Sequence, residues 1–295
     1  MVDMERVTFG IGGQALSALV AGPEDGETVV LVHGLLTGAE LWRGVADELV
    51  ETGRHVVAVD LPGHGETLTP ARADHSPGGM AELLGTWLRT TAGTAPWVIA
   101  HDLGGGVAQI VATRYPTAMS HLTLSGSMVE DTWPVPFVDK LRKRADSSLR
   151  RPVSTSRLHR WVARGAGPNG LGADDVARVF EHGTVTDDDV IRSLERQLSA
   201  LDSTDTVVAA AQLSRLPMPV DLVWGDADPY TPADAVAGRL LELAPQAEMG
   251  LVADTGHWAP LEDPAGFVAT CLDVRDRDRT VSAEAEPDAD APESA

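Results

Sequence analysis

An aspartate stands where an apolar strand pattern gives way to a helix pattern. The apolar run covers residues 97–100, Asp102 follows it, and glycines begin at Gly104. The small residues Ala100 and Gly104 flank Asp102 and permit the sharp turn that exposes the nucleophile in G-x-S-x-G sequences, with aspartate in place of serine. A carboxylate is already ionised at neutral pH, so it can attack carbon without a base to activate it.

A carboxylate nucleophile narrows the range of reactions. Attack on an ester carbonyl would form an anhydride while expelling a far more basic alkoxide, so return to substrate would dominate. The same carboxylate can open an epoxide or displace a halide at saturated carbon and leave an alkyl ester on Asp102, which water then hydrolyses. This chemistry requires neither a metal ion nor an organic cofactor.

The elements that must position Asp102 form an alternating pattern. After a predicted hairpin over residues 7–20, short apolar runs are expected as strands at 28–32, 55–59, 97–100, 121–124 and 220–224. Helix-like segments separate most of these runs, including residues 39–51, 79–90 and 104–115. Buried strands that alternate with helices predict an α/β protein with a mostly parallel, doubly wound sheet, and ligands on such sheets bind beyond the carboxyl ends of the strands.

The alternation is interrupted between residues 128 and 215. This stretch carries helix signals and no convincing strand, and a helical insertion between two core strands indicates a cap, or lid. The sequence therefore predicts a core made of residues 1–127 and 216–275, with a helical cap at 128–215. Residues 276–295 are expected to form a disordered acidic tail, because the end of the chain is rich in Ala, Glu, Asp, Pro and Ser.

Composition excludes several classes of partner. The chain has 295 residues, 43% of them apolar, which suffices for one large core. Its formal net charge of -21 argues against nucleic acid or an anionic membrane surface as partner. The single cysteine, Cys271, rules out an internal disulfide and a cysteine-rich metal site. Neither a secretion signal nor a membrane-spanning apolar run is evident, so a cytoplasmic location is expected. The expected oligomeric state is a monomer or homodimer.

Several motifs accompany the aspartate turn in a characteristic order. They are His33-Gly34-Leu35-Leu36, Asp60-Leu-Pro-Gly63-His-Gly65, the turn at Asp102, Trp224-Gly225-Asp226-Ala227-Asp228-Pro229-Tyr-Thr-Pro232 and Thr255-Gly256-His257-Trp258. With these motifs the chain resembles the α/β-hydrolase superfamily over about residues 5 to 275, in the aspartate-nucleophile branch of epoxide hydrolases and haloalkane dehalogenases. The resemblance implies an α/β-hydrolase fold with a helical cap insertion.

The resemblance also implies a catalytic triad, because this fold presents nucleophile, acid and histidine in that chain order. Asp102 would be the nucleophile, His257 the base that activates water, and Asp228 the acid that orients the imidazole and stabilises its cation. The family spacing Asp-x-x-x-Pro favours Asp228, which precedes Pro232. The other candidates for the acid are Asp226, Glu130 and Asp131.

The remaining candidate residues surround the triad. The backbone N–H groups of Leu35 and Leu103 would form the oxyanion hole for hydrolysis of the Asp102 ester, and His33 would orient its loop. The side chains expected at the substrate pocket are Leu36, Trp133, His159, Trp161 and Trp258. The apolar character of this pocket favours a small, largely apolar organic substrate, and no metal site is expected.

The sequence departs from both relatives that use an aspartate nucleophile. Epoxide hydrolases use cap tyrosines as proton donors, and residues 128–215 contain no tyrosine. Haloalkane dehalogenases usually have tryptophan after the nucleophile and often asparagine after His-Gly, where this chain has Leu103 and Leu35. Histidine or water can protonate an alkoxide, whereas a halide needs two N–H donors, so epoxide opening is the preferred hypothesis. The alternatives are a haloalkane dehalogenase and a non-hydrolytic lyase or cyclase that uses Asp102 as acid or base.

Overall fold

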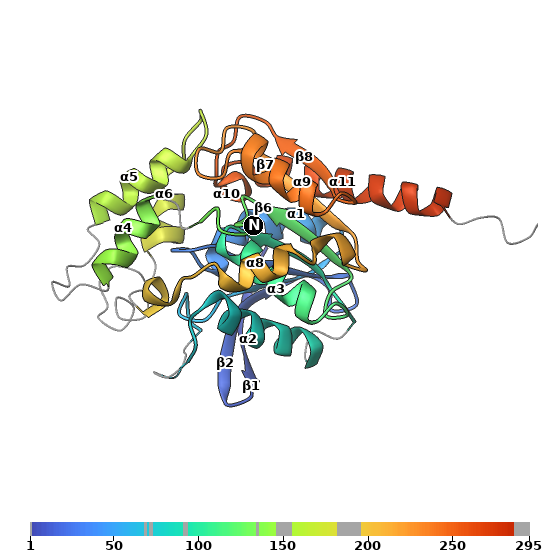
Figure 1. Ribbon diagram of the computed structural model, residues 1–295, viewed down its shortest axis with the longest axis horizontal. Coiled ribbons are helices and arrows are strands. Elements are labelled where there is room, and N and C mark those ends of the chain that lie inside the picture. The colour runs from blue at the N-terminus through green and yellow to red at the C-terminus, as the bar shows by residue number, and fades with distance from the viewer. Residues whose placement is uncertain are drawn as a thin grey trace, which may run out of the picture.

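A central sheet organises the chain. The computed structural model describes residues 2–67, 70, 73–90, 94–133, 136–145, 155–181 and 196–285. Within them, eight strands form one sheet in the order β1-β2-β4-β3-β5-β6-β7-β8 (Figure 1). The strands are β1 (Glu5–Ile11), β2 (Gln14–Ala21), β3 (Thr28–Val32), β4 (His55–Val59), β5 (Trp97–His101), β6 (His121–Ser125), β7 (Val220–Gly225) and β8 (Glu248–Val252).

Pairing in this sheet is parallel except at one edge. β1 and β2 form an antiparallel hairpin and β2 pairs antiparallel with β4, whereas the pairs from β4 to β8 are parallel. The strand order reverses at β3, which lies between β4 and β5. The carboxyl ends of β3 and β5 therefore lie side by side at a topological switch point, where ligands bind in sheets of this kind.

The expected fold class is confirmed, and each predicted strand is present. The strand segments are apolar and rich in β-branched residues, and in β3 the residues from Val29 to Val32 are fully buried. β8 has no counterpart among the predicted strands. It lies at the edge of the sheet, where Leu251 is exposed and Gly250 interrupts the apolar pattern.

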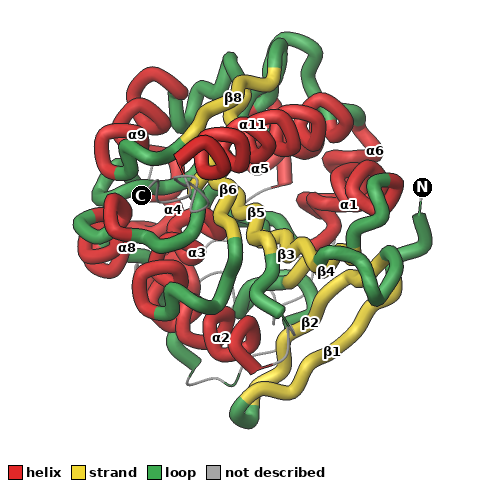
Figure 2. The backbone as a smooth tube through the Cα atoms, turned by 90° about the vertical axis from the view of Figure 1, so that its right-hand side faces the viewer, coloured by secondary structure: helices red, strands yellow, loops and turns green. Residues whose placement is uncertain are grey.

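Helices cover both faces of the sheet. Figure 2 shows α1 and α11 on one face and α2, α3 and α8 on the other. The helices are α1 (Arg43–Glu51), α2 (Pro77–Thr90), α3 (Leu103–Arg114), α4 (Pro136–Ala145), α5 (Thr155–Gly165), α6 (Ala173–Val176), α8 (Thr204–Ala210), α9 (Gly238–Leu243), α10 (Ala259–Glu262) and α11 (Pro264–Ala285). Short 3₁₀ or π turns occupy Ala39–Trp42, Ala177–Glu181, Leu213–Arg215 and Ala233–Ala237. None of the helices in the described ranges is long and apolar enough to cross a membrane.

A buried polar pair lies at the amino end of the sheet, away from the switch point. His121, at the start of β6, pairs through Nε2 with the carboxylate of Asp221 on β7, and both side chains are buried. Trp97 packs edge-on against His121 with 6.1 Å between ring centroids. The pair therefore contributes to the join between neighbouring strands at this end of the core.

The elements described between β6 and β7 are helical. α4, α5 and α6 lie at one side of the molecule in the view of Figure 1. α8, by contrast, packs against α2 and α3 beside the sheet. The range of 128–215 expected for the cap thus includes a helix that belongs to the layers around the core.

α11 continues past the expected end of the core. It is helical to Ala285, so the expectation of disorder from residue 276 is wrong for residues 276–285, while residues 286–295 lie outside the described part of the chain. Ion pairs account for part of this extension. Arg275 donates to Glu27 at 3.0 Å, and Arg277 pairs with Asp273 one turn earlier. Such spacing of opposite charges supports a helix that composition alone does not predict.

Candidate active site

Asp102 occupies the turn between β5 and α3, at the switch point of the sheet. Its backbone has a φ of 51° and a ψ of −119°, and a positive φ of this kind costs a non-glycine residue roughly 1–3 kcal/mol. Two glycines make room for the turn. A Cβ on Gly104 would lie 2.3 Å from the carbonyl oxygen of His33, and one on Gly34 would lie 2.6 Å from Oδ2 of Asp102. The loop after β3 can therefore pack directly against the carboxylate.

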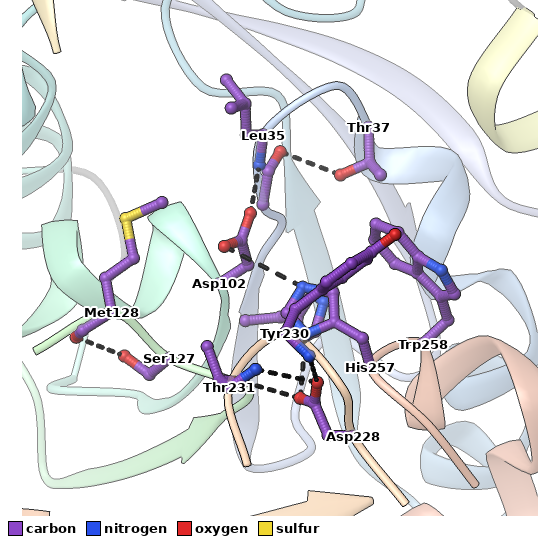
Figure 3. Close-up of polar contacts among 12 residues, drawn as sticks. Leu35, Thr37, Asp102, Ser127, Met128, Asp228, Tyr230, Thr231, His257 and Trp258 are labelled. Carbon is purple, nitrogen blue, oxygen red and sulfur yellow. Dashed lines mark hydrogen bonds and ion pairs between the residues drawn. The ribbon is translucent and has the colours of Figure 1, made fainter. Parts of the chain in front are cut away.

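The two oxygens of the Asp102 carboxylate have different environments (Figure 3). Oδ2 accepts the backbone N–H of Leu35 at 2.8 Å. The backbone of Leu103 also donates to this carboxyl group. Oδ1 lies 3.9 Å from Nε2 of His257. The N–H groups expected to form an oxyanion hole thus contact the carboxylate of Asp102 itself, and its second oxygen faces the histidine.

His257 lies between Asp102 and Asp228 (Figure 3). Its Nδ1 is 2.9 Å from Oδ2 of Asp228. Asp228 is held in turn by the backbone N–H groups of Tyr230 at 2.8 Å and Thr231 at 3.0 Å, and by the Thr231 hydroxyl at 2.6 Å. A carboxylate can only accept at Nδ1, so Nδ1 carries a proton and Nε2 is the atom available to take one.

Of the four acids considered from the sequence, Asp228 is the one that contacts His257. Glu130 instead forms a salt bridge with Arg239 at 2.7 and 2.9 Å. Asp226 and Asp131 are exposed. The burial of Asp228 and its hydrogen bonds make it the only one of the four that is held against the imidazole.

The charges of the three side chains are coupled. Burial by itself would raise the pKa of Asp228, but the charge of His257 and the hydrogen bonds from His257 and Thr231 lower it to about 2. Burial would lower the pKa of His257, but the charges of Asp228 and Asp102 outweigh burial and raise it above its ordinary value. Burial raises the pKa of Asp102, against the charge of His257 and the N–H groups of Leu35 and Leu103. Asp228 is therefore ionised throughout the neutral range.

Two further histidines support the loops around the site. Nδ1 of His33 lies 2.7 Å from the carbonyl oxygen of Gly34, and its Nε2 accepts the N–H of Leu61 at 2.9 Å. Nδ1 of His101 lies 2.9 Å from the carbonyl oxygen of Ser125. Burial lowers the pKa of both imidazoles, and that of His101 falls well below its ordinary value. They are neutral hydrogen-bonding groups that hold the backbone.

A small cavity adjoins Asp102 and His257. Its volume is about 20 Å³, which is room for about one water molecule. The other described residues that line it are Leu35, Met128, Thr132, Trp133, Val138, Trp161, Tyr230 and Thr231. Within that described lining there is neither lysine nor arginine, so the cavity offers no cation to pair with an anionic substrate.

Trp133 and Trp161 line this cavity, whereas three other side chains expected there do not. Leu36 has a φ of 64° and its side chain packs into the buried core. Trp258 is fully buried and packs against the imidazole of His257 at 4.7 Å between ring centroids. His159 lies two positions before Trp161 on α5, which places it about 200° around the helix. These three residues therefore lie outside the lining of this cavity.

Met128, Thr132, Val138, Tyr230 and Thr231 also line the cavity and were not expected there from the sequence. Met128 and Thr132 follow β6 and so reach the same sheet edge as Asp102, a signal that the strand pattern contained. Tyr230 follows the acid motif, stacks on Trp161 at 5.2 Å between ring centroids and donates its hydroxyl to the Trp161 carbonyl. The cavity is thus lined by a tyrosine, although this residue follows Asp228 and lies outside residues 128–215.

Comparisons with known proteins place this geometry in context. Residues 29–270 match the model of the alpha/beta hydrolase family. The pimeloyl-[acyl-carrier protein] methyl ester esterase of Nitrosomonas europaea is 28% identical over 261 residues, covering 85% of this chain and 96% of the esterase. A solved alpha/beta hydrolase fold protein from Burkholderia ambifaria has a TM-score of 0.80 at 24% identity, covering 92% of this chain and 98% of its own. The epoxide hydrolase CorEH has a TM-score of 0.74 at 22% identity, covering 93% and 99%.

Proposed function

This chain belongs to the alpha/beta hydrolase family and is a hydrolase of that fold, and we propose that it opens an epoxide through a covalent ester on Asp102. The observation that carries the proposal is that the two oxygens of the Asp102 carboxylate have different partners. Oδ2 accepts the N–H of Leu35 at 2.8 Å, while Oδ1 lies 3.9 Å from Nε2 of His257 beside the cavity. Oδ1 is therefore the attacking atom, and Oδ2 already occupies the oxyanion site.

The first step forms the ester. A lone pair of Oδ1 of Asp102 bonds to an epoxide carbon, the C–O bond of the ring breaks, and the alkoxide takes a proton from His257 or from water. The Asp102 carboxylate becomes a neutral ester. One of the charges that raise the pKa of His257 disappears with this step. The imidazole therefore gives up its proton more readily at the stage that requires a base.

The second step hydrolyses the ester. Nε2 of His257 takes a proton from water, and the water oxygen attacks the carboxyl carbon of Asp102. The negative charge then develops on Oδ2, where the N–H groups of Leu35 and Leu103 stabilise it. Asp228, at 2.9 Å from Nδ1, stabilises the imidazolium. Collapse of the intermediate breaks the bond between the carboxyl carbon and Oδ1, and the imidazolium of His257 gives its proton to the departing Oδ1. The diol leaves with Oδ1, and Asp102 is again a carboxylate, with one oxygen that came from water.

The proposed substrate is a small, neutral, largely apolar molecule. Leu35, Met128, Val138 and the indoles of Trp133 and Trp161 supply apolar walls, and the described lining lacks a lysine or arginine that would bind a carboxylate substrate. A cavity of about 20 Å³ cannot hold such a molecule, so side chains contributed by the cap must move when it binds. We propose that the reaction uses no cofactor and that neither nucleic acid nor a membrane is a partner.

Haloalkane dehalogenation is the second candidate. Trp133 and Trp161 both line the cavity beside the nucleophile, and indole N–H groups are donors suited to a departing halide. The indole of Trp133 donates to the Thr206 hydroxyl at 3.3 Å in this conformation, so it would have to exchange that partner for the halide. Bromide release from a bromoalkane distinguishes this candidate from epoxide opening.

The test is a single turnover in ¹⁸O-labelled water, with styrene oxide in one arm and 1-bromobutane in the other. We expect the diol from styrene oxide and one ¹⁸O atom in the peptide that contains Asp102. Product formation without label in Asp102 would refute the covalent mechanism. A product that has gained no oxygen would instead identify the lyase or cyclase alternative. Bromide release without diol formation would favour the dehalogenase.

A further inference from the structure

Glu262, at the end of α10, holds the backbone on both sides of His257. Its carboxylate accepts the N–H of Gly256 at 3.0 and 3.2 Å and that of Trp258 at 3.2 Å. Oε2 also accepts the N–H of Gly167 at 2.6 Å, in the segment that follows α5. Hydrogen bonds to a charged acceptor are about twice as strong as neutral ones. One side chain thus connects the histidine loop to the cap.

The end of α5 lies directly on the histidine loop. The last carbonyl groups of a helix lack partners within the helix, and donors from the core bind them here. These contacts join the His257 N–H to the Gly165 carbonyl at 2.6 Å, the Trp258 indole to the Val162 carbonyl at 2.9 Å, and the Tyr230 hydroxyl to the Trp161 carbonyl. A Cβ on Gly256 would lie 2.2 Å from the carbonyl oxygen of Gly165. Only glycine permits this approach of the two backbones.

Several charged or titratable groups act on His257 from the elements packed around it. They are the carboxylates of Asp102, Asp228 and Glu262, the imidazole of His101 and the phenol of Tyr230. Burial lowers the pKa of His257, and the three carboxylates raise it. Burial raises the pKa of Glu262 itself, and its three backbone donors oppose that effect. Unlike Asp228, Glu262 acts through the backbone and through its charge, without a hydrogen bond to the ring.

We propose that Glu262 is a positioning residue that links the placement of His257 to closure of the cap. The inference rests on the proposed role of His257 as the base. Entry of a substrate requires the cavity to widen, and movement of α5 would break the bonds of the Gly167 and His257 backbones together. The imidazole is then fixed in place only when α5 returns to the core. Water is activated under a closed cap, where the ester is shielded from bulk solvent.

Glu262→Gln tests this role, because the amide nitrogen cannot accept an N–H and the charge is lost while the size is kept. The matched control is Glu242→Gln on α9, which removes a charge from an exposed side chain that pairs with Arg239 at 2.7 Å. Single-turnover kinetics with styrene oxide separate ester formation from ester hydrolysis. NMR titration of the His257 ring without substrate reports its pKa.

We expect Glu262→Gln to slow ester hydrolysis about 10- to 100-fold, the scale of a ~1 Å misplacement, and to change ester formation less than about twofold. The pKa of His257 should be lower than in the wild type and in Glu242→Gln. An unchanged pKa in the folded variant would overturn the proposal, as would equal slowing of both steps. If styrene oxide does not react, the proposed function fails for this probe, while the titration still tests Glu262.

Gly167→Ala is a second variant that keeps the charge of Glu262. A Cβ at this position would lie 2.7 Å from the backbone of Asp254 and of Gly256, so the cap segment must shift away from the histidine loop. We expect slower ester hydrolysis with the pKa of His257 still raised. Ester hydrolysis at the wild-type rate in Gly167→Ala would contradict the proposal that closure of the cap positions His257. This test remains valid if Glu262→Gln does not fold.

Discussion

Replacement of His257 by glutamine should arrest the enzyme as its covalent ester. Glutamine cannot take a proton from water at neutral pH, so the second step loses its base. Asp228 keeps three of its four hydrogen bonds, those from the backbone N–H groups of Tyr230 and Thr231 and from the Thr231 hydroxyl, which preserves the loop around Asp228. Asp102 keeps its bond from Leu35 at 2.8 Å, and Oδ1 remains able to attack.

The size of the effect follows from the surroundings of Asp102. Loss of a general base slows a step by about 10²–10⁴, and the described lining of the cavity offers no other histidine or carboxylate to replace His257. For a typical turnover of ~10 s⁻¹, ester hydrolysis would fall to roughly 10⁻¹–10⁻³ s⁻¹, which is a lifetime between about 10 seconds and about 20 minutes. Ester formation should be much less affected. The amount of adduct should therefore approach one substrate molecule per protein chain.

Intact-mass spectrometry after an acid quench measures this adduct. His257→Gln mixed with styrene oxide should gain the mass of one substrate molecule, and digestion should locate it on Asp102. A double variant that also carries Asp102→Asn is the control and should gain no mass. Turnover of His257→Gln at the wild-type rate would refute the assignment of the base. An adduct at another residue would refute the assignment of the nucleophile.

Three further outcomes are expected. Ester hydrolysis in a single turnover should accelerate as pH rises through the pKa of His257, because only the neutral imidazole accepts a proton. The midpoint of this rise should lie below the His257 pKa that NMR gives for the free enzyme, because alkylation removes the Asp102 charge that helps to raise that pKa. A midpoint above the free-enzyme pKa would contradict this reasoning. Asp228→Asn should slow ester hydrolysis by about 10²–10⁴ and should lower the pKa of His257 measured by NMR, since the amide has no charge to stabilise the imidazolium. A wild-type rate together with a wild-type pKa would exclude Asp228 as the acid. His121→Leu should reduce the free energy of unfolding in urea by about 3–5 kcal/mol, because it leaves the buried carboxylate of Asp221 unpaired; a loss of about 1 kcal/mol, typical of an exposed pair, would show that this carboxylate is not isolated from water.

The fold and the sharp turn at Asp102 were predictable because they depend on neighbouring residues. Apolar runs and glycine spacing around Asp102 specify a buried strand and a sharp turn within a few positions. β8 was not predictable in this way, because an edge strand that contains Gly250 and an exposed Leu251 has no clear periodicity. The ion pair of Arg275 on α11 with Glu27 was not predictable either, because it joins residues that are distant in the chain.

The sequence by itself determined the aspartate at the turn after β5, the class of sheet and the order in which Asp102, Asp228 and His257 occur. Only the tertiary structure decided which acid contacts the imidazole, which oxygen of Asp102 faces it, and which side chains line the cavity. It also brought Glu262 and the end of α5 onto the histidine loop. Local patterns in a sequence specify strands and turns. These contacts, by contrast, join residues that are far apart in the chain and that meet only when the sheet edge and α5 pack together.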